Sequence, residues 1–135
     1  MSASSAAATP LTFLSFDFSL KRVGVASGNS LTRSATPLKT ITAEGDARFA
    51  AIGKLIAEWR PAALVVGVPF HPDGAAHDNT RRAQRFARQL AGRFGLPVHE
   101  VDERYTTTEA LAQGERDIDA AAAALILEQY LREQA

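Results

Sequence analysis

Residues 15–26, Ser-Phe-Asp-Phe-Ser-Leu-Lys-Arg-Val-Gly-Val-Ala, decide how this chain folds. The apolar, alternating run Leu11–Phe18 predicts a strand, and Arg22–Ser27 predicts a second one after a tight connection at 19–21. Asp17 lies inside the first of these strands. Because burying a carboxylate is costly unless a cation or strong hydrogen bonds meet it, Asp17 requires a partner. Taken alone, a turn-capping aspartate would be the ordinary explanation.

The rest of the chain predicts an α/β protein. Gly28-Asn29-Ser30 is a turn signal, and Ser34–Ile41 reads as a third strand in which Pro37 favours an edge position or a bulge. The expected elements that follow are a helix at about Asp46–Trp59, a buried strand at Ala63–Val68, an arginine-rich helix from its N-cap Thr80 to about Phe94, a strand at Pro97–Glu103, a short helix at Thr107–Gln113 and a last helix at Asp119–Glu133. This order predicts a mixed five-stranded sheet with helices on both faces. We expect one domain over residues 11–135 after a disordered leader at 1–10.

Composition excludes several classes of protein. With 135 residues, of which 46% are hydrophobic, the chain can bury one ordinary core. No apolar run is long enough to cross a bilayer, and the first residues lack the basic start and apolar stretch of a secretory signal. The chain has no cysteine, so it has no disulfide frame and no thiolate metal site. We therefore expect a cytoplasmic protein without a membrane partner.

The formal net charge is +0, but the charges are segregated along the chain. The segment 81–93 contains arginines and no acid, whereas acids dominate the segment 100–119. A basic helix beside an acidic pocket suits a polyanion held by arginines while metal ions bind the carboxylates. Arg81, Arg85 and Arg88 share one outward side of the expected helix and are candidate nucleic-acid contacts. The alternative is an ordinary solvated helix face.

Acidic residues recur where elements end or begin. Asp102 and Glu103 end the fifth strand and Asp119 opens the last helix, so both sites can converge on Asp17 if the first, fourth and fifth strands lie side by side. Crowded carboxylates raise one another's pKa unless a divalent cation neutralises them, and oxygen ligands favour Mg²⁺ or Mn²⁺. Such ions can support phosphodiester cleavage. The alternatives are a simple helix cap for Asp119 and a surface charge for Asp102.

Four blocks in series resemble the YqgF family, small RNase H-like proteins associated with pre-16S rRNA processing or Holliday junction resolution. They are DFSLKRVGVA at 17–26, VVGVPFHPDG at 65–74, DERYTTTEA at 102–110 and DAAAAALIL at 119–127. The resemblance covers the chain from about residue 11 to residue 131. It implies an RNase H-like fold and a Mg²⁺- or Mn²⁺-dependent endonuclease that processes the 5′ end of pre-16S rRNA, on structured RNA or ribosomal precursor particles.

The resemblance also implies roles for individual residues. Asp17, Glu103 and Asp119 would be the catalytic, metal-binding acids, with Asp102 as a further metal ligand or a substitute for Glu103, and Lys21 and Arg22 would contact phosphate. Ser19 stands where the family usually has glycine, so its side chain would either crowd the metal site or supply a hydroxyl to it. We expect His71 and His77 to be exposed loop histidines.

Other functions stay open at this stage. A resolvase acting on four-way DNA would favour a dimer presenting two sites, whereas the sequence indicates no more than a monomer or a weak homodimer. A non-catalytic nucleic-acid-binding protein could retain the same fold. The sequence does not distinguish an RNA from a DNA substrate, because contacts between arginine and phosphate carry no base information.

Overall fold

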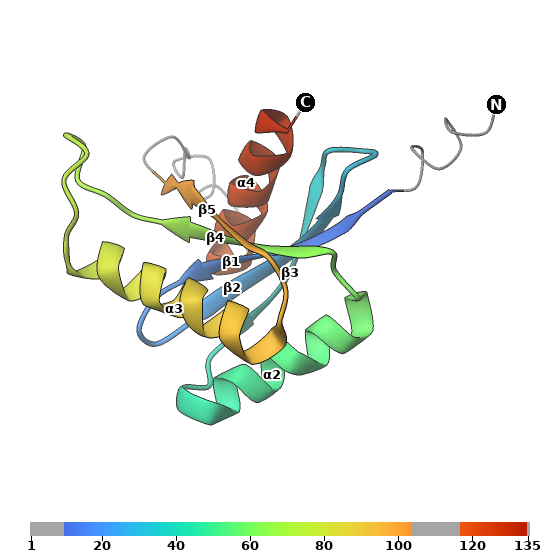
Figure 1. The fold of residues 1–135 in the computed structure, drawn as a ribbon, viewed down its shortest axis with the longest axis horizontal. Coiled ribbons are helices and arrows are strands. Elements are labelled where there is room, and N and C mark those ends of the chain that lie inside the picture. The colour runs from blue at the N-terminus through green and yellow to red at the C-terminus, as the bar shows by residue number, and fades with distance from the viewer. Residues whose placement is uncertain (1–9, 104–116, 135) are drawn as a thin grey trace.

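The structure, a computed structural model, describes residues 10–103 and 117–134 (Figure 1). Its elements are, in chain order, β1 (Thr12–Phe18), β2 (Val23–Asn29), β3 (Ala35–Ile41), α2 (Gly45–Trp59), β4 (Ala63–Val68), α3 (Asp78–Phe94), β5 (Val98–Asp102) and α4 (Ile118–Glu133). Residues 1–9 of the expected leader and the expected helix at 107–113 lie outside the described residues. Among the described helices, none combines the length and the apolar character needed to cross a bilayer.

The strands form one mixed sheet in the order β3-β2-β1-β4-β5. β1 pairs antiparallel with β2 and parallel with β4, while β5 runs parallel to β4. β3 is an edge strand, as Pro37 predicted, and the register shifts between Val25 and Ala26 of β2 at the same place. β1, β4 and β5 therefore lie side by side, with their carboxyl ends at the same edge of the sheet.

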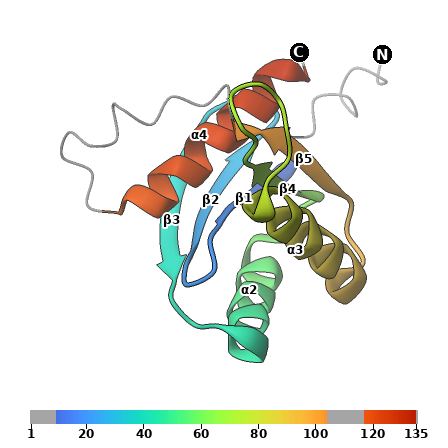
Figure 2. The ribbon, with the colours of Figure 1, turned by 90° about the vertical axis from the view of Figure 1, so that its left-hand side faces the viewer.

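Helices cover both faces of the sheet, with α2 and α3 on one side and α4 on the other (Figures 1 and 2). Successive side chains of β1 point to opposite faces of the sheet. Leu14 and Phe16 pack in the core formed with α2 and α3, whereas Phe13 packs against α4 together with Tyr130. Asp17 shares the parity of Phe13 and therefore lies on the α4 side.

Two helix starts differ from the sequence prediction. α3 begins at Asp78 rather than at Thr80, because the His77 side chain is the N-cap and accepts a hydrogen bond from the Asn79 amide at 3.1 Å. The Thr80 hydroxyl instead accepts from the His77 amide at 3.0 Å, which completes a reciprocal capping pair. His77 is therefore a half-buried cap, not an exposed loop histidine. α4 is capped by Asp117, so Asp119 lies in its first turn.

Candidate active site

Asp17 is flanked by a glycine on each neighbouring strand. Its register partners are Gly24 on β2 and Gly67 on β4. A Cβ atom at Gly67 would lie 2.6 Å from Glu103 Oε1, and a Cβ atom at Gly24 would lie 1.9 Å from the Asp119 carbonyl oxygen. Neither position can carry a side chain without displacing its neighbour. The two glycines thus let Glu103 and the first turn of α4 approach the sheet around Asp17.

Asp17 and Glu103 form a hydrogen-bonded carboxyl pair. Two carboxyl groups can bond in this way only if one of them carries a proton. Burial, the hydrogen bond to Asp17 and the charges of Asp17 and Asp102 raise the pKa of Glu103 to about 9. Burial also raises the pKa of Asp17, opposed by the hydrogen bond from Glu103 and reinforced by the charge of Asp119. Glu103 therefore holds the shared proton near neutral pH.

The structure distinguishes the two adjacent acids at the end of β5. Asp102 is the register partner of Val68, which packs in the core formed with α2 and α3. Glu103 follows and reaches back to Asp17 across the gap that Gly67 leaves. Glu103 is thus the acid in direct contact with Asp17, whereas Asp102 acts on Glu103 through its charge.

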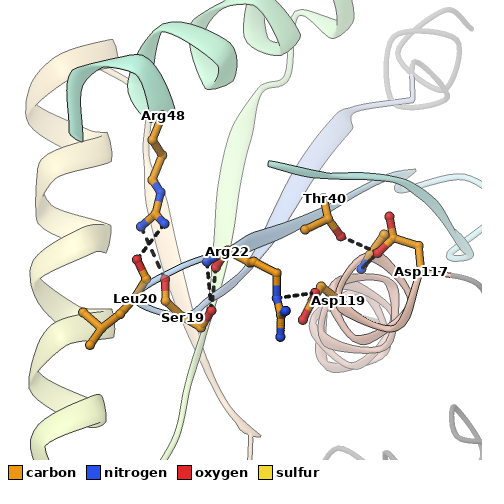
Figure 3. Close-up of polar contacts among 8 residues, drawn as sticks. Ser19, Leu20, Arg22, Thr40, Arg48, Asp117 and Asp119 are labelled. Carbon is orange, nitrogen blue, oxygen red and sulfur yellow. Dashed lines mark hydrogen bonds and ion pairs between the residues drawn. The ribbon is translucent and has the colours of Figure 1, made fainter. Parts of the chain in front are cut away.

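Asp119 lies close enough to raise the pKa of Asp17 by its charge but is bound to Arg22 (Figure 3). The distance between Arg22 Nε and Asp119 Oδ2 is 3.1 Å. Asp119 also lies in the first turn of α4, where the positive end of the helix dipole attracts an acidic side chain. Within residues 10–103 and 117–134, no three His, Asp or Glu side chains are arranged to hold a metal ion. The structure brings Asp17 and Glu103 together and directs Asp119 to Arg22, and it leaves Lys21 exposed.

The chemistry of these donors fits a hard divalent cation. Asp17, Glu103 and Asp119 present carboxylate oxygens, which Mg²⁺ and Mn²⁺ prefer. Burial is the main cause of the raised pKa values of Asp17 and Glu103, and the charges of neighbouring acids add to it, so the fully ionised pair is unfavourable and the shared proton relieves it. A divalent cation can replace that proton, because it supplies more positive charge at the same place.

The turn after Asp17 is fixed by Ser19 and by Arg48, a residue that sequence reasoning missed. The Ser19 hydroxyl donates to the Arg22 carbonyl at 2.8 Å and accepts from the Arg22 amide at 3.1 Å. Arg48 of α2, only 6% exposed, donates to the carbonyls of Ser19 at 3.3 Å and Leu20 at 2.9 Å (Figure 3). The only feature of the sequence that could have indicated this role is the position of Arg48 directly before Phe49, which faces inward.

Ser19 does not need the conformational freedom of glycine. Among the described residues other than glycine, positive φ angles occur only at Arg33 and Arg60. The backbone of Ser19 therefore accepts a side chain, and its hydroxyl is engaged within the turn rather than supplied to the carboxyl pair.

The arginines of α3 are exposed, as the sequence predicted, but they do not act as one uniform stripe. Arg81 is held by Asp78 at 2.9 Å. Arg85 lines a cavity of about 320 Å³ between α2, α3 and the β1–β2 turn, together with Arg82, which the sequence pattern did not single out. Arg88 lies one turn further along the helix. Through this cavity Arg85 and Arg82 are the α3 arginines that adjoin the turn after Asp17.

Known proteins resemble this chain over nearly its whole length. A sequence model of the RuvX family, described as a Holliday junction resolvase, matches residues 11–133. A protein of Polaromonas sp. (strain JS666) named "Putative pre-16S rRNA nuclease" is 69% identical, over 90% of this chain and 88% of its own length. One of the same name from Albidiferax ferrireducens is also 69% identical, over 93% of this chain and 81% of its own.

Solved structures of low sequence identity share the fold. Thermus thermophilus RuvC superimposes with a TM-score of 0.61 at 13% identity, covering 92% of this chain and 96% of that one. The same protein in complex with a Holliday junction substrate gives 0.57, covering 92% and 95%. The mixed sheet with α4 on one face and α2 and α3 on the other is thus the RNase H-like fold of RuvC. Together with the match over residues 11–133, the close relatives establish that this chain belongs to the RuvX family, also called YqgF.

Proposed function

We propose that this chain is a Mg²⁺- or Mn²⁺-dependent endonuclease that processes the 5′ end of pre-16S rRNA in the cytoplasm. The observation that carries the proposal is the proton-sharing pair Asp17–Glu103, set between Gly24 and Gly67 and adjoined by Asp119. A pair of this kind is unfavourable for stability, so it is best explained by a cation-binding role. The names of the close relatives support RNA processing as the activity.

In this proposal Asp17 and Glu103 hold the metal and Asp119 joins them. When bound, the metal would activate a water molecule and stabilise the leaving oxygen of the phosphodiester. Asp17 and Glu103 would bind it as carboxylates, so their shared proton leaves when the ion arrives. Arg22 neutralises Asp119 without the ion, and its side chain is 59% exposed. It is therefore positioned to exchange Asp119 for a substrate phosphate, with Lys21 beside it.

The substrate-binding side of the proposal rests on the arginines of α3. Arg85 and Arg82 line the cavity next to the β1–β2 turn, and Arg81 and Arg88 lie exposed on the same helix. Guanidinium groups on one helix can follow the phosphates of a nucleic-acid strand leading away from the acids. This function implies that the substrate RNA is bound as part of ribosomal precursor particles.

Cleavage of four-way DNA junctions is the second candidate. The description of the matching family as a Holliday junction resolvase favours it. This activity would call for a dimer with two sites, and oligomeric state is therefore a useful measurement beside cleavage.

The test is cleavage of a pre-16S rRNA 5′ fragment and of a matched four-way DNA junction, each with Mg²⁺, Mn²⁺ or EDTA. The proposal expects metal-dependent cleavage of the RNA, absent from Asp17→Asn and retained by Asp46→Asn, an exposed control on α2. Preferential cleavage of the junction would favour the resolvase. Equal activity of Asp17→Asn and the unchanged protein would refute a nuclease centred on these acids, and binding without cleavage would favour a non-catalytic role.

A further inference from the structure

A second polar cavity lies at the opposite end of β1 from the acids. Its volume is about 260 Å³, and its lining includes the hydroxyl side chains of Thr12, Ser27, Thr32, Ser34 and Thr36 and the indole of Trp59. Thr12 is five residues from Asp17 along β1, which corresponds to roughly 17 Å in a strand. Thr12 also lies on the α2–α3 face of the sheet, whereas Asp17 lies on the α4 face. The cavity is therefore separate from the candidate active site.

Three hydroxyls of this cavity are left without a hydrogen-bonding role by the described part of the chain. Ser27 is only 6% exposed, and its register partner on β3 is Thr36. In the described part of the chain, the side-chain hydroxyls of Ser27, Thr36 and Thr12 make no hydrogen bond to another residue. Within the described residues no buried side-chain polar atom lacks a partner, so the Ser27 hydroxyl is open to the cavity and can bond to whatever occupies it. Here the cavity is the route by which a partner can arrive.

Trp59 supplies an aromatic wall beside these hydroxyls. Trp59 is 36% exposed at the last position of α2. A flat aromatic ring next to hydrogen-bonding groups suits another flat ring with polar edges, and base–aromatic stacking is a common mode of binding unpaired nucleotides. The lining side chains are uncharged, so the cavity itself favours a base over a phosphate.

Positive charge adjoins the cavity in the sequence. Arg60 follows Trp59, whereas Arg33, although it stands between Thr32 and Ser34, lines a different cavity together with Phe13 and Leu131. Both arginines are exposed, and within the described residues neither forms an ion pair with an acid. A neutral cavity whose tryptophan is followed by an arginine without an acidic partner matches the chemistry of a nucleotide, which joins an uncharged base to an anionic phosphate.

We propose that this cavity binds one unpaired nucleotide of a nucleic-acid strand, with the base against Trp59 and the phosphate toward Arg60. The choice of nucleic acid as the ligand rests on the proposed function, but binding does not require the acids or a metal ion. The site would hold a single-stranded part of the substrate away from the cleavage point, and it favours substrates with an unpaired segment.

The chain has a single tryptophan, so the fluorescence of Trp59 reports on this cavity directly. We would titrate the full chain in EDTA with adenosine, with adenosine 5′-monophosphate and with a six-nucleotide single-stranded RNA. All three should change the fluorescence saturably. Ser27→Ala and Thr36→Ala should weaken binding of all three by about fivefold or more. Arg60→Ala should weaken the two phosphate-bearing ligands but not adenosine, and Arg132→Ala serves as the exposed control.

Substitutions of Trp59 remove the fluorescent side chain, so they need a second measurement of binding. Anisotropy of the labelled RNA should give at least about fivefold weaker binding to Trp59→Ala and little change for Trp59→Phe, which keeps a stacking ring. No saturable fluorescence change, or unchanged affinity in both Ser27→Ala and Thr36→Ala, would overturn the proposal. An equal response to free ribose would overturn it too, because the site would then recognise a sugar.

The experiments distinguish failure of the nucleotide-site proposal from failure of the nuclease proposal. Nucleotide binding without metal-dependent cleavage leaves the cavity as a binding site and removes the nuclease. Cleavage that is lost in Asp17→Asn, with no response of Trp59 to nucleotides, leaves the nuclease and removes the cavity.

Discussion

Glu103 reaches Asp17 across the space left by Gly67, the residue paired with Asp17 on the neighbouring parallel strand. The contact joins β1 to the end of β5 although β4 separates these two strands in the sheet. A side chain at Gly67 would occupy the place of the Glu103 carboxyl group. The carboxyl pair therefore depends on the absence of one methyl group.

Replacing this glycine tests that dependence. Gly67→Ala should lower the free energy of unfolding by about 1–3 kcal/mol, because its Cβ would lie 2.4 Å from Ile126 Cδ1, and it should abolish cleavage by displacing Glu103. Gly24→Ala should destabilise at least as much, since it meets the backbone of Asp119. Gly92→Ala is the control: nothing lies within 4 Å, so the helix should gain about 0.5–1 kcal/mol. Denaturant unfolding measures all three, and equal effects at Gly67 and Gly92 would contradict the packing argument.

Removing one member of the carboxyl pair should separate activity from stability. Asp17→Asn should reduce metal-dependent cleavage to the level seen in EDTA. Its free energy of unfolding without metal should be unchanged or slightly higher, because a neutral amide beside Glu103 relieves repulsion. A cleavage assay and a thermal melt on the same preparation check both expectations. A large drop in melting temperature would mean that Asp17 is structural.

The raised pKa of Glu103 predicts a pH dependence with a definite sign. Its pKa is 4.5 when unperturbed and about 9 in the folded chain, so between these values the folded state holds a proton that the unfolded state releases. The contribution of Glu103 to stability should therefore fall as pH rises from about 4.5 to about 9 in metal-free buffer. Glu103→Gln should flatten this slope in denaturant titrations, and Mg²⁺ should offset it in the unchanged protein. An identical slope in Glu103→Gln would disprove the assignment.

The α3 arginines should contribute to nucleic-acid binding through charge. Replacing Arg81, Arg85 and Arg88 together by alanine should weaken RNA binding and reduce the slope of log K against log salt by about 0.7–0.9 for each phosphate that is no longer neutralised. Arg81→Ala alone should have the smallest effect, because Asp78 already neutralises it. Binding measured over a salt series decides the matter, with Arg93→Ala, which is paired with Asp46, as the control. An unchanged salt slope would leave the arginines as an ordinary solvated face.

Ser19→Gly should weaken the β1–β2 turn rather than activate the enzyme. The substitution removes both hydrogen bonds between the Ser19 hydroxyl and the backbone of Arg22, and it increases the freedom of the unfolded chain. We expect a decrease of roughly 1 kcal/mol in unfolding free energy and no gain in metal affinity. Higher cleavage activity in Ser19→Gly would show that the side chain crowds the site after all.

Much of the fold could be predicted because local patterns and burial agree. The wholly buried strand Ala63–Val68 has the predicted bounds, since a continuous apolar run between turn residues has few alternatives. The helix starts were less predictable. His77 and Asp117 act as caps in place of Thr80 and Asp119, because several nearby side chains could accept the same amide hydrogens.

The sequence by itself determined the order of the elements that the structure describes, the edge position or bulge expected at Pro37 and the motifs that place acids at strand and helix ends. Only the tertiary structure decided that Glu103 rather than Asp102 meets Asp17, that Asp119 is bound to Arg22 and that Arg48 fastens the turn. These contacts join residues far apart in the chain, so they depend on strand register and on which face a side chain occupies. Local propensity sets the elements, but the pairing of β1 with β4 and the packing of α4 set the site.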